Sequence, residues 1–163
     1  MKKQKVPSTA AVRFLKANKI EFTPFFYKYK EHGGTKEASN QLNIEENRIV
    51  KTLVLEDSNG NGLIVLMNGN KEVSLKKLAR IMGVKSVSLC PPQKANKYSG
   101  YMVGGTSPFG FKTKLPIYAQ ADIFQFEKIL INGGQRGFLI EISSRDLDRA
   151  LKPLKIDAGI EQT

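Results

Sequence analysis

The sequence predicts a single α/β domain, residues 1–163, in which helices pack against a mixed sheet. The chain has 163 residues, of which 40% are hydrophobic and 25% are charged, enough to bury one core without disulfides. Short apolar runs typical of strands alternate with segments whose apolar residues recur at helical spacing. At least one pair of strands is joined by a short turn, which breaks the strict alternation of a purely parallel sheet.

The N-terminal part is predicted to form a helix. Pro7, Ser8 and Thr9 are typical of a helix start, and the apolar pattern that follows ends near Asn18. The basic arm before it, residues 1–6, is expected to be flexible because it carries almost no apolar surface.

Strands of the central sheet are predicted next. The aromatic segment 22–29 alternates in part, and its Pro24 is typical of an edge strand. A short helix follows over 35–42. The aliphatic segments 49–56 and 63–67 flank the turn sequence DSNGNG, so we expect them to pair as a hairpin in the middle of the sheet.

A helix between Ser74 and Gly83 has one apolar stripe, with Ser74 suited to the N-cap and Gly83 to the C-terminal stop. Its other face carries Lys76, Lys77 and Arg80. These cations are candidates for contact with a polyanion, although a solvated face explains them equally well.

The remaining elements follow in order. Further strands are predicted at 86–89, 115–119, 128–131 and 137–142, and a helix opened by proline at 91–100. Asn132-Gly133 is the strongest hairpin signal and is predicted to turn the chain between the last two strands. Ser143 and Asp146 have the spacing of a capping box for the last helix.

The charge balance points to a polyanionic partner. The formal net charge is +11 and the pI is about 9.8, more than solubility requires, and the basic residues are spread along the chain. Nucleic acid is therefore favoured over a merely basic protein. A single cysteine and the lack of any long apolar stretch predict a cytoplasmic protein without membrane contact.

The segment YMVGGTSPFGFK, residues 101–112, approaches a phosphate-loop pattern but fails it. In the phosphate-loop pattern the lysine directly follows the second glycine, whereas Lys112 stands one residue further along the chain. Pro108 also removes a backbone N–H donor, and no helical pattern follows the loop. An NTPase is therefore disfavoured. What remains is a loop of backbone donors and hydroxyls suited to close approach by a ligand.

The usual catalytic constellations are missing. His32 is the one histidine and Cys90 the one cysteine. A metal site built from several histidines is therefore not expected, and a conventional Ser-His-Asp triad has no second histidine as a candidate. Cys90 follows an apolar strand and is more typical of a structural thiol than of a nucleophile. His32, beside two glycines, is more typical of a solvated turn than of a phosphate contact.

Lys51 interrupts an apolar row. Alternation puts Ile49, Lys51, Leu53 and Leu55 on one face of a strand. Such a lysine either finds an anionic or hydrogen-bonding partner after losing hydration, or extends its ammonium to water from a strand end. Periodicity leaves both interpretations open.

Four segments, RIVKTLVL, GYMVGGTSPFG, KLP and INGGQRG, occur in this order at compatible spacing. Together they resemble the YbaK/EbsC family of aminoacyl-tRNA deacylases, also found as an editing insertion in bacterial prolyl-tRNA synthetases. The resemblance covers nearly the whole chain. It implies a curved, barrel-like mixed sheet flanked by helices, with a pocket for the 3′ end of a mischarged tRNA and no cofactor or metal.

The resemblance also implies site residues. The lysine of the family's KT pair falls on Lys51, as the catalytic residue. The substrate-binding residues that it implies are Tyr27, Tyr29, Thr52, Gly104, Gly105, Thr106, Ser107, Pro108, Asn132 and Gly133. Tyr27 is preferred to Tyr29 as the family tyrosine.

Two departures bear on specificity. A family serine is Asn132 here, and an aspartate of the cysteine-clearing type is Leu139. These departures leave the amino acid open: Leu139 makes its surroundings less polar, while Asn132 keeps a hydrogen-bond donor and acceptor. A small, uncharged amino acid is therefore expected, with Cys-tRNA(Pro) as the first expectation and Ala-tRNA(Pro) or another small-amino-acid tRNA as the alternative.

The expected chemistry needs no nucleophile from the protein. An aminoacyl ester is already activated, so the site can orient it and stabilise the oxyanion with backbone N–H groups. The resemblance implies that a cysteine substrate attacks with its own thiol, whereas alanine needs water. Partners implied are tRNA(Pro) and prolyl-tRNA synthetase. A protein that binds tRNA or a synthetase without chemistry is the rival interpretation, because charge supports binding alone.

Overall fold

The computed structural model describes residues 4–162 of the chain. These residues form five α-helices: α1 Ala10–Ala17, α2 Gly34–Leu42, α3 Leu75–Met82, α4 Pro92–Ser99 and α5 Ser144–Leu151. They also form two short 3-10 helices, η1 Glu46–Arg48 and η2 Ala121–Gln125. The ten strands are β1 Thr23–Phe26, β2 Ile49–Asp57, β3 Gly62–Asn68, β4 Lys71–Val73, β5 Val87–Leu89, β6 Ile117–Gln120, β7 Lys128–Gln135, β8 Phe138–Ser143, β9 Leu154–Ile156 and β10 Gly159–Glu161.

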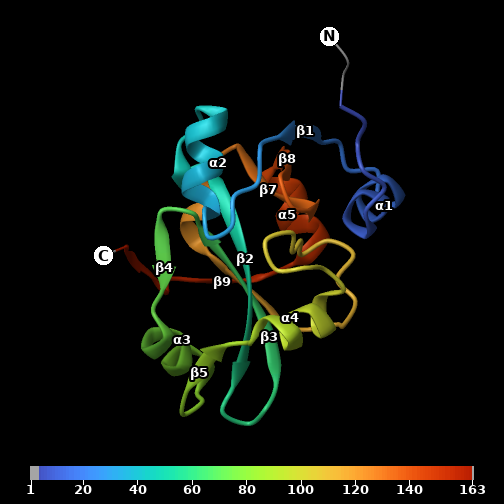
Figure 1. Cartoon of the computed structure of the whole chain (residues 1–163). Helices are drawn as coiled ribbons and strands as arrows, with labels where there is room; N and C mark the ends of the chain where they lie inside the picture. The colour runs from blue at the N-terminus through green and yellow to red at the C-terminus, as the bar shows by residue number, and fades with distance from the viewer. Residues whose placement is uncertain (1–3, 163) are drawn as a thin grey trace.

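The predicted mixed α/β class is confirmed. The main sheet has the order β1-β8-β7-β2-β3-β6-β9, and β5 pairs with the far end of β2. The pairs β2–β7, β3–β6 and β6–β9 are parallel, and the other pairs of this sheet are antiparallel. A separate two-stranded sheet joins β4 to β10. Figure 1 shows β2 as the long central strand, with α2 near one end of it and α4 alongside. The barrel-like curvature stays a prediction.

The helix ends follow the sequence signals. Thr9 caps α1 through a hydrogen bond from the Val12 amide to its side chain. Ser74 caps α3 in the same way, and Gly83 stops it with a φ of 72°. Both helices were predicted to within a residue because the cap supplies acceptors for amides that have no partner inside the helix.

The predicted edge strand and central hairpin are also confirmed. β1 lies at one end of the sheet, where Pro24 pairs in register with Ile140. β2 and β3 are antiparallel, with Lys51 opposite Met67.

The predicted turn at Asn132-Gly133 is wrong, although the two strands that it was expected to join do pair. Asn132 and Gly133 lie inside β7, and the chain turns at Arg136 and Gly137. A β-bulge separates Asn132 from Gln135. The Asn132 side-chain oxygen accepts hydrogen bonds from the amides of the second and third residues after it, and Gly134 takes a φ of 102°. The Asn-Gly pair therefore stabilises a bulge rather than the turn.

The last helix is capped differently from the predicted capping box. The Ser143 hydroxyl accepts from the Arg145 amide, and Asp146 pairs with Arg149 at 2.7 Å. The three-residue strands β4, β9 and β10 were not predicted, because their segments carry no clear apolar run or alternation.

The sheet has two differently packed faces. Along β8, Phe138, Ile140 and Ile142 belong to the core that α1 and α5 cover, whereas Leu139 belongs to a smaller cluster with Ala38 of α2. Of the predicted N-terminal arm, residues 1–3 lie outside the described part of the chain. Val6 packs against the larger core.

Candidate active site

A cavity of about 580 Å³ lies on the α2 side of the sheet. Its walls are formed by the segment after β1, α2, the first half of β2, the end of β5, α4, the glycine loop (residues 101–112) and the region around the turn between β7 and β8. Of the residues implied by the family resemblance, seven line it: Tyr27, Tyr29, Lys51, Thr52, Gly104, Thr106 and Asn132. The cavity therefore gathers side chains separated by more than a hundred positions in the sequence.

Lys51 is partly buried in the cavity wall and its ammonium donates a hydrogen bond to the backbone carbonyl of Lys71. Burial lowers the pKa of Lys51 below its ordinary value, and the carboxylates of Glu46 and Glu72 raise it in part. Of the two interpretations that periodicity left open, the structure supports a desolvated lysine with a hydrogen-bond partner.

The carbonyl that receives Lys51 is itself held in place. Lys71 lies on β4, which pairs with β10 at the end of the described chain. Its side chain is fixed by an ion pair of 2.5 Å with Asp122. The position of the Lys51 ammonium therefore depends on strands that periodicity did not reveal.

Thr52 adds an unsatisfied hydroxyl to the same wall. Its Oγ1 atom is buried and has no hydrogen-bond partner among the described residues. An unpaired buried hydroxyl is costly, but an atom without exposed surface cannot meet a ligand in this conformation, so the binding role of Thr52 stays a prediction.

The glycine loop presents its backbone to the cavity. Gly104 has a φ of 91°, and a Cβ there would lie 2.8 Å from the hydroxyl of Tyr29, so a side chain would meet both strain and a clash. The amide of Val103 bonds to the Asn96 side chain and that of Gly105 to a carbonyl of the loop. Within residues 4–162 the amides of Gly104 and Thr106 have no acceptor, so they are available to an oxyanion.

Four residues implied by the resemblance are absent from the lining that the described residues form: Gly105, Ser107, Pro108 and Gly133. All four are buried. Ser107 accepts a hydrogen bond from the Phe109 amide, and Gly133 packs against the Phe138 ring. Their role as substrate contacts stays a prediction, and in this structure they support the loop and the bulge.

Asn132 and Leu139, the two departures from the family pattern, line the cavity. Leu139 is 4% exposed and packs with Ala38, Ile49 and Leu130, so this part of the wall is apolar. The side-chain nitrogen of Asn132 donates to the Gly104 carbonyl at 3.1 Å, while its oxygen holds the bulge. Asn132 therefore links the β-bulge of β7 to the glycine loop by hydrogen bonds.

Both candidate tyrosines line the cavity. Burial raises the pKa of Tyr27, whose aromatic ring packs with the cluster around Leu139. Tyr29 instead contacts Gly104 of the loop. The preference for Tyr27 stays a prediction.

Three further lining residues were missed or set aside in the sequence. Arg136 stands in the INGGQRG segment, but only its neighbours were considered. Cys90 reaches the cavity, yet burial raises its pKa, which favours the unreactive thiol. His32 lies at the exposed rim. Sequence spacing gives no signal for these three, because their proximity is created by the fold.

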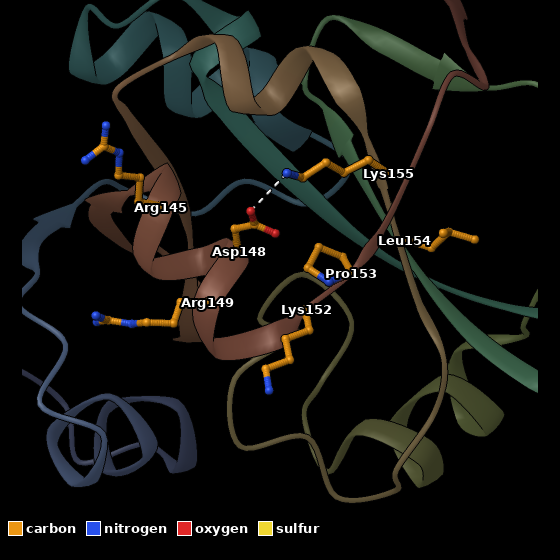
Figure 2. Close-up of a pocket in the computed structure, with 7 residues that line it drawn as sticks. All are labelled: Arg145, Asp148, Arg149, Lys152, Pro153, Leu154 and Lys155. Carbon is orange, nitrogen blue, oxygen red and sulfur yellow. Dashed lines mark hydrogen bonds and ion pairs between the residues drawn. The ribbon is translucent and has the colours of Figure 1, made fainter.

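A second hollow lies around the end of α5 and the start of β9, and Figure 2 shows its seven lining residues. Lys155 pairs there with Asp148 at 2.9 Å, and Arg149 pairs with Asp146. α5 packs on the larger core, so this hollow lies on the opposite side of the sheet from the cavity. None of the predicted site residues lines it. The cavity around Lys51 is therefore the candidate site.

Between residues 4 and 162, no three side chains of histidine, cysteine, aspartate or glutamate are grouped to hold a metal ion. Over the same residues, every helix is too short or too polar to span a membrane.

Comparison with known proteins identifies the family. A family model for the aminoacyl-tRNA editing domain matches residues 31–150. EbsC of Enterococcus faecalis, named as a Cys-tRNA(Pro)/Cys-tRNA(Cys) deacylase, is 32% identical over 87% of both chains. A proline–tRNA ligase of Syntrophotalea carbinolica is 34% identical over 41% of this chain, which corresponds to 12% of the ligase.

Solved structures show the same fold. The hypothetical protein APE2540 superposes with a TM-score of 0.84 at 24% identity, covering 93% of this chain and 99% of its own. A protein described as a trans-editing enzyme for prolyl tRNA synthetase superposes with a TM-score of 0.79 at 22% identity, covering 97% and 100%. With the match over residues 31–150 and the relationship to EbsC, these findings show that the chain belongs to the aminoacyl-tRNA editing domain family.

Proposed function

We propose that this chain removes a wrongly attached small amino acid from tRNA by cleaving the aminoacyl ester at the 3′ terminus, with Cys-tRNA(Pro) as its main substrate. The proposal is carried by one observation: a partly buried lysine and two loop residues whose amides have no acceptor among the described residues, Gly104 and Thr106, line the same cavity. The relationship to EbsC supports both the reaction and the amino acid.

Lys51 positions the substrate rather than attacking it. An ammonium has three N–H donors, and one is engaged by the Lys71 carbonyl. The other two can hold the ribose or the terminal phosphate and fix the ester. The amides of Gly104 and Thr106 then stabilise the negative charge that develops on the carbonyl oxygen.

When the amino acid is cysteine, the substrate itself supplies the nucleophile. The substrate thiol attacks the carbonyl carbon, the carbon–oxygen bond to the ribose breaks, and the thiol proton passes to the departing ribose hydroxyl. The products are a cyclic thiolactone and free tRNA. This route fits a cavity whose own thiol, Cys90, has a raised pKa.

Alanine is the second candidate, because the wall around Leu139 is apolar and suits a methyl side chain. Water must then be the nucleophile, since alanine has no thiol. Thr106, Tyr27 and Tyr29, which line the cavity, are hydroxyl-bearing candidates to orient it.

The test is a panel of tRNA(Pro) charged separately with cysteine, alanine, serine or proline. With substrate in excess, we expect many turnovers, with cysteine released fastest, alanine close behind and proline spared. Release of no more than one equivalent would support the rival interpretation of a tRNA-binding protein. Proline cleared as well as cysteine would overturn the editing role, and repeating the panel with purified prolyl-tRNA synthetase tests whether that partner is required.

A further inference from the structure

Arg136 joins three walls of the cavity. It stands in the turn between β7 and β8, and its guanidinium carbon lies 4.8 Å from the centre of the Tyr29 ring. Its Nε atom donates to the carbonyl of Val103 at 3.0 Å. The stack and the hydrogen bond together fix the plane of the guanidinium at the edge of the cavity.

The outer nitrogens of Arg136 remain available. Arg48 pairs with Glu141 and Arg149 with Asp146, whereas Arg136 has no carboxylate partner among residues 4–162. A guanidinium presents its N–H donors as a planar fork that matches two oxygens of a phosphate. Arg136 is thus an oriented cation with open donors.

The charges of the lining favour an anion at this position. The fixed cations are Lys51 and Arg136, and the carboxylate is Glu31. Lys51 is partly buried, while Arg136 is exposed, which places Arg136 nearer the mouth. A ligand that reaches Lys51 with a ribose ester would therefore leave its backbone phosphates near the mouth.

We propose that Arg136 binds the phosphodiester that precedes the terminal nucleotide of the RNA substrate, and that Tyr29 and Val103 hold its guanidinium in place for this contact. The inference rests on the proposed function, because it assigns the contact to the same substrate. It adds a substrate-binding residue at the mouth that is separate from the lysine at the ester.

The first experiment compares Arg136→Gln with the control Arg149→Gln, which removes an equal charge from the hollow in Figure 2. An RNA oligonucleotide that has the sequence of the tRNA 3′ end and carries no amino acid serves as a competitive inhibitor. We expect Arg136→Gln to weaken its inhibition constant roughly tenfold to a hundredfold, the range for a charge-assisted contact. The control variant should bind it like the wild type, and both variants should melt like the wild type because both side chains are exposed.

The second experiment changes the RNA instead of the protein. A neutral methylphosphonate replaces the phosphodiester before the terminal nucleotide. In the wild type this replacement should weaken binding as much as Arg136→Gln does, and in the variant it should have little additional effect, since the two changes remove the same contact. Equal weakening of both oligonucleotides by Arg136→Gln would overturn the proposal, because Arg136 would then act only through the loop.

A third variant separates charge from geometry. Arg136→Lys keeps the charge but loses the fork and the bond to Val103, so we expect binding between that of the wild type and Arg136→Gln. A wild type that binds the oligonucleotide but hydrolyses no charged tRNA would refute the proposed function alone. A wild type that hydrolyses, with unchanged binding in Arg136→Gln, would refute this inference alone.

Discussion

Replacing Lys51 with alanine is expected to abolish most deacylation while leaving the protein folded. One N–H of its ammonium bonds to the Lys71 carbonyl, which leaves two for the substrate. A charge-assisted hydrogen bond contributes about 1.5–3 kcal/mol. The lower end for two bonds, about 3 kcal/mol, corresponds to a loss of roughly a hundredfold in kcat/KM.

The assay measures amino acid released from charged tRNA(Pro) at limiting substrate, with the thermal melt recorded in parallel. The free energy of unfolding should fall by only about 1–2 kcal/mol. The lysine stem is only partly buried, and burial already disfavours the charged ammonium in the folded protein. Lys155→Ala is the matched control, since it removes a paired lysine from the other hollow. Full activity of a folded Lys51→Ala protein would refute the site.

Three further expectations follow from the same geometry. On Ala-tRNA(Pro), which has no thiol of its own to ionise, enzymatic kcat/KM should fall as the pH rises through the lowered pKa of Lys51, because the anchoring ammonium becomes neutral; a rise would identify a general base instead. Gly104→Ala should lose at least tenfold in kcat, since strain at φ 91° displaces the loop, whereas an unchanged rate would exclude a catalytic loop. Replacing Lys76, Lys77 and Arg80 of α3 with glutamine should reduce the salt dependence of tRNA binding if this face contacts phosphates, and an unaltered slope would leave it as a solvated face.

The helices and the central hairpin were predictable because their signals are local. Ser74 and Gly83 mark the ends of α3 by satisfying backbone groups within a few residues of themselves. β2 and β3 are long, aliphatic and separated by one turn, so their pairing needs no distant information. Here sequence pattern and tertiary structure agree.

The Asn132 bulge shows where local reasoning fails. An Asn-Gly pair favours both a two-residue turn and a bulge, because each needs unusual backbone angles nearby. The choice depends on contacts that are distant in sequence, including the Thr9 hydroxyl, which donates to the Gly133 carbonyl at 2.5 Å. Such contacts leave no trace in the pattern of the segment itself.

The candidate site was predictable only through the family resemblance. Alternation alone left the environment of Lys51 open, since its carbonyl partner Lys71 lies 20 positions later on a strand of three residues. Cys90 had no pattern that connected it to Lys51, and Arg136 was connected to it only through the INGGQRG segment of the resemblance. The cavity that unites them forms only when α4, β2 and the β7–β8 turn come together.

Amino-acid selectivity follows from what the wall around Leu139 can and cannot do. Leu139, Ala38 and Ile49 form an apolar surface, so it can distinguish substrates only by size and hydrophobicity. One methylene contributes only about 1–3 kcal/mol to such a choice, too little to separate cysteine sharply from alanine. Sharper discrimination must arise in the chemical step, where a thiol that attacks its own ester gives cysteine a route that alanine lacks. Cysteine and alanine should therefore bind with similar affinity, and the modest lead of cysteine expected in the tRNA(Pro) panel should lie in kcat rather than in KM.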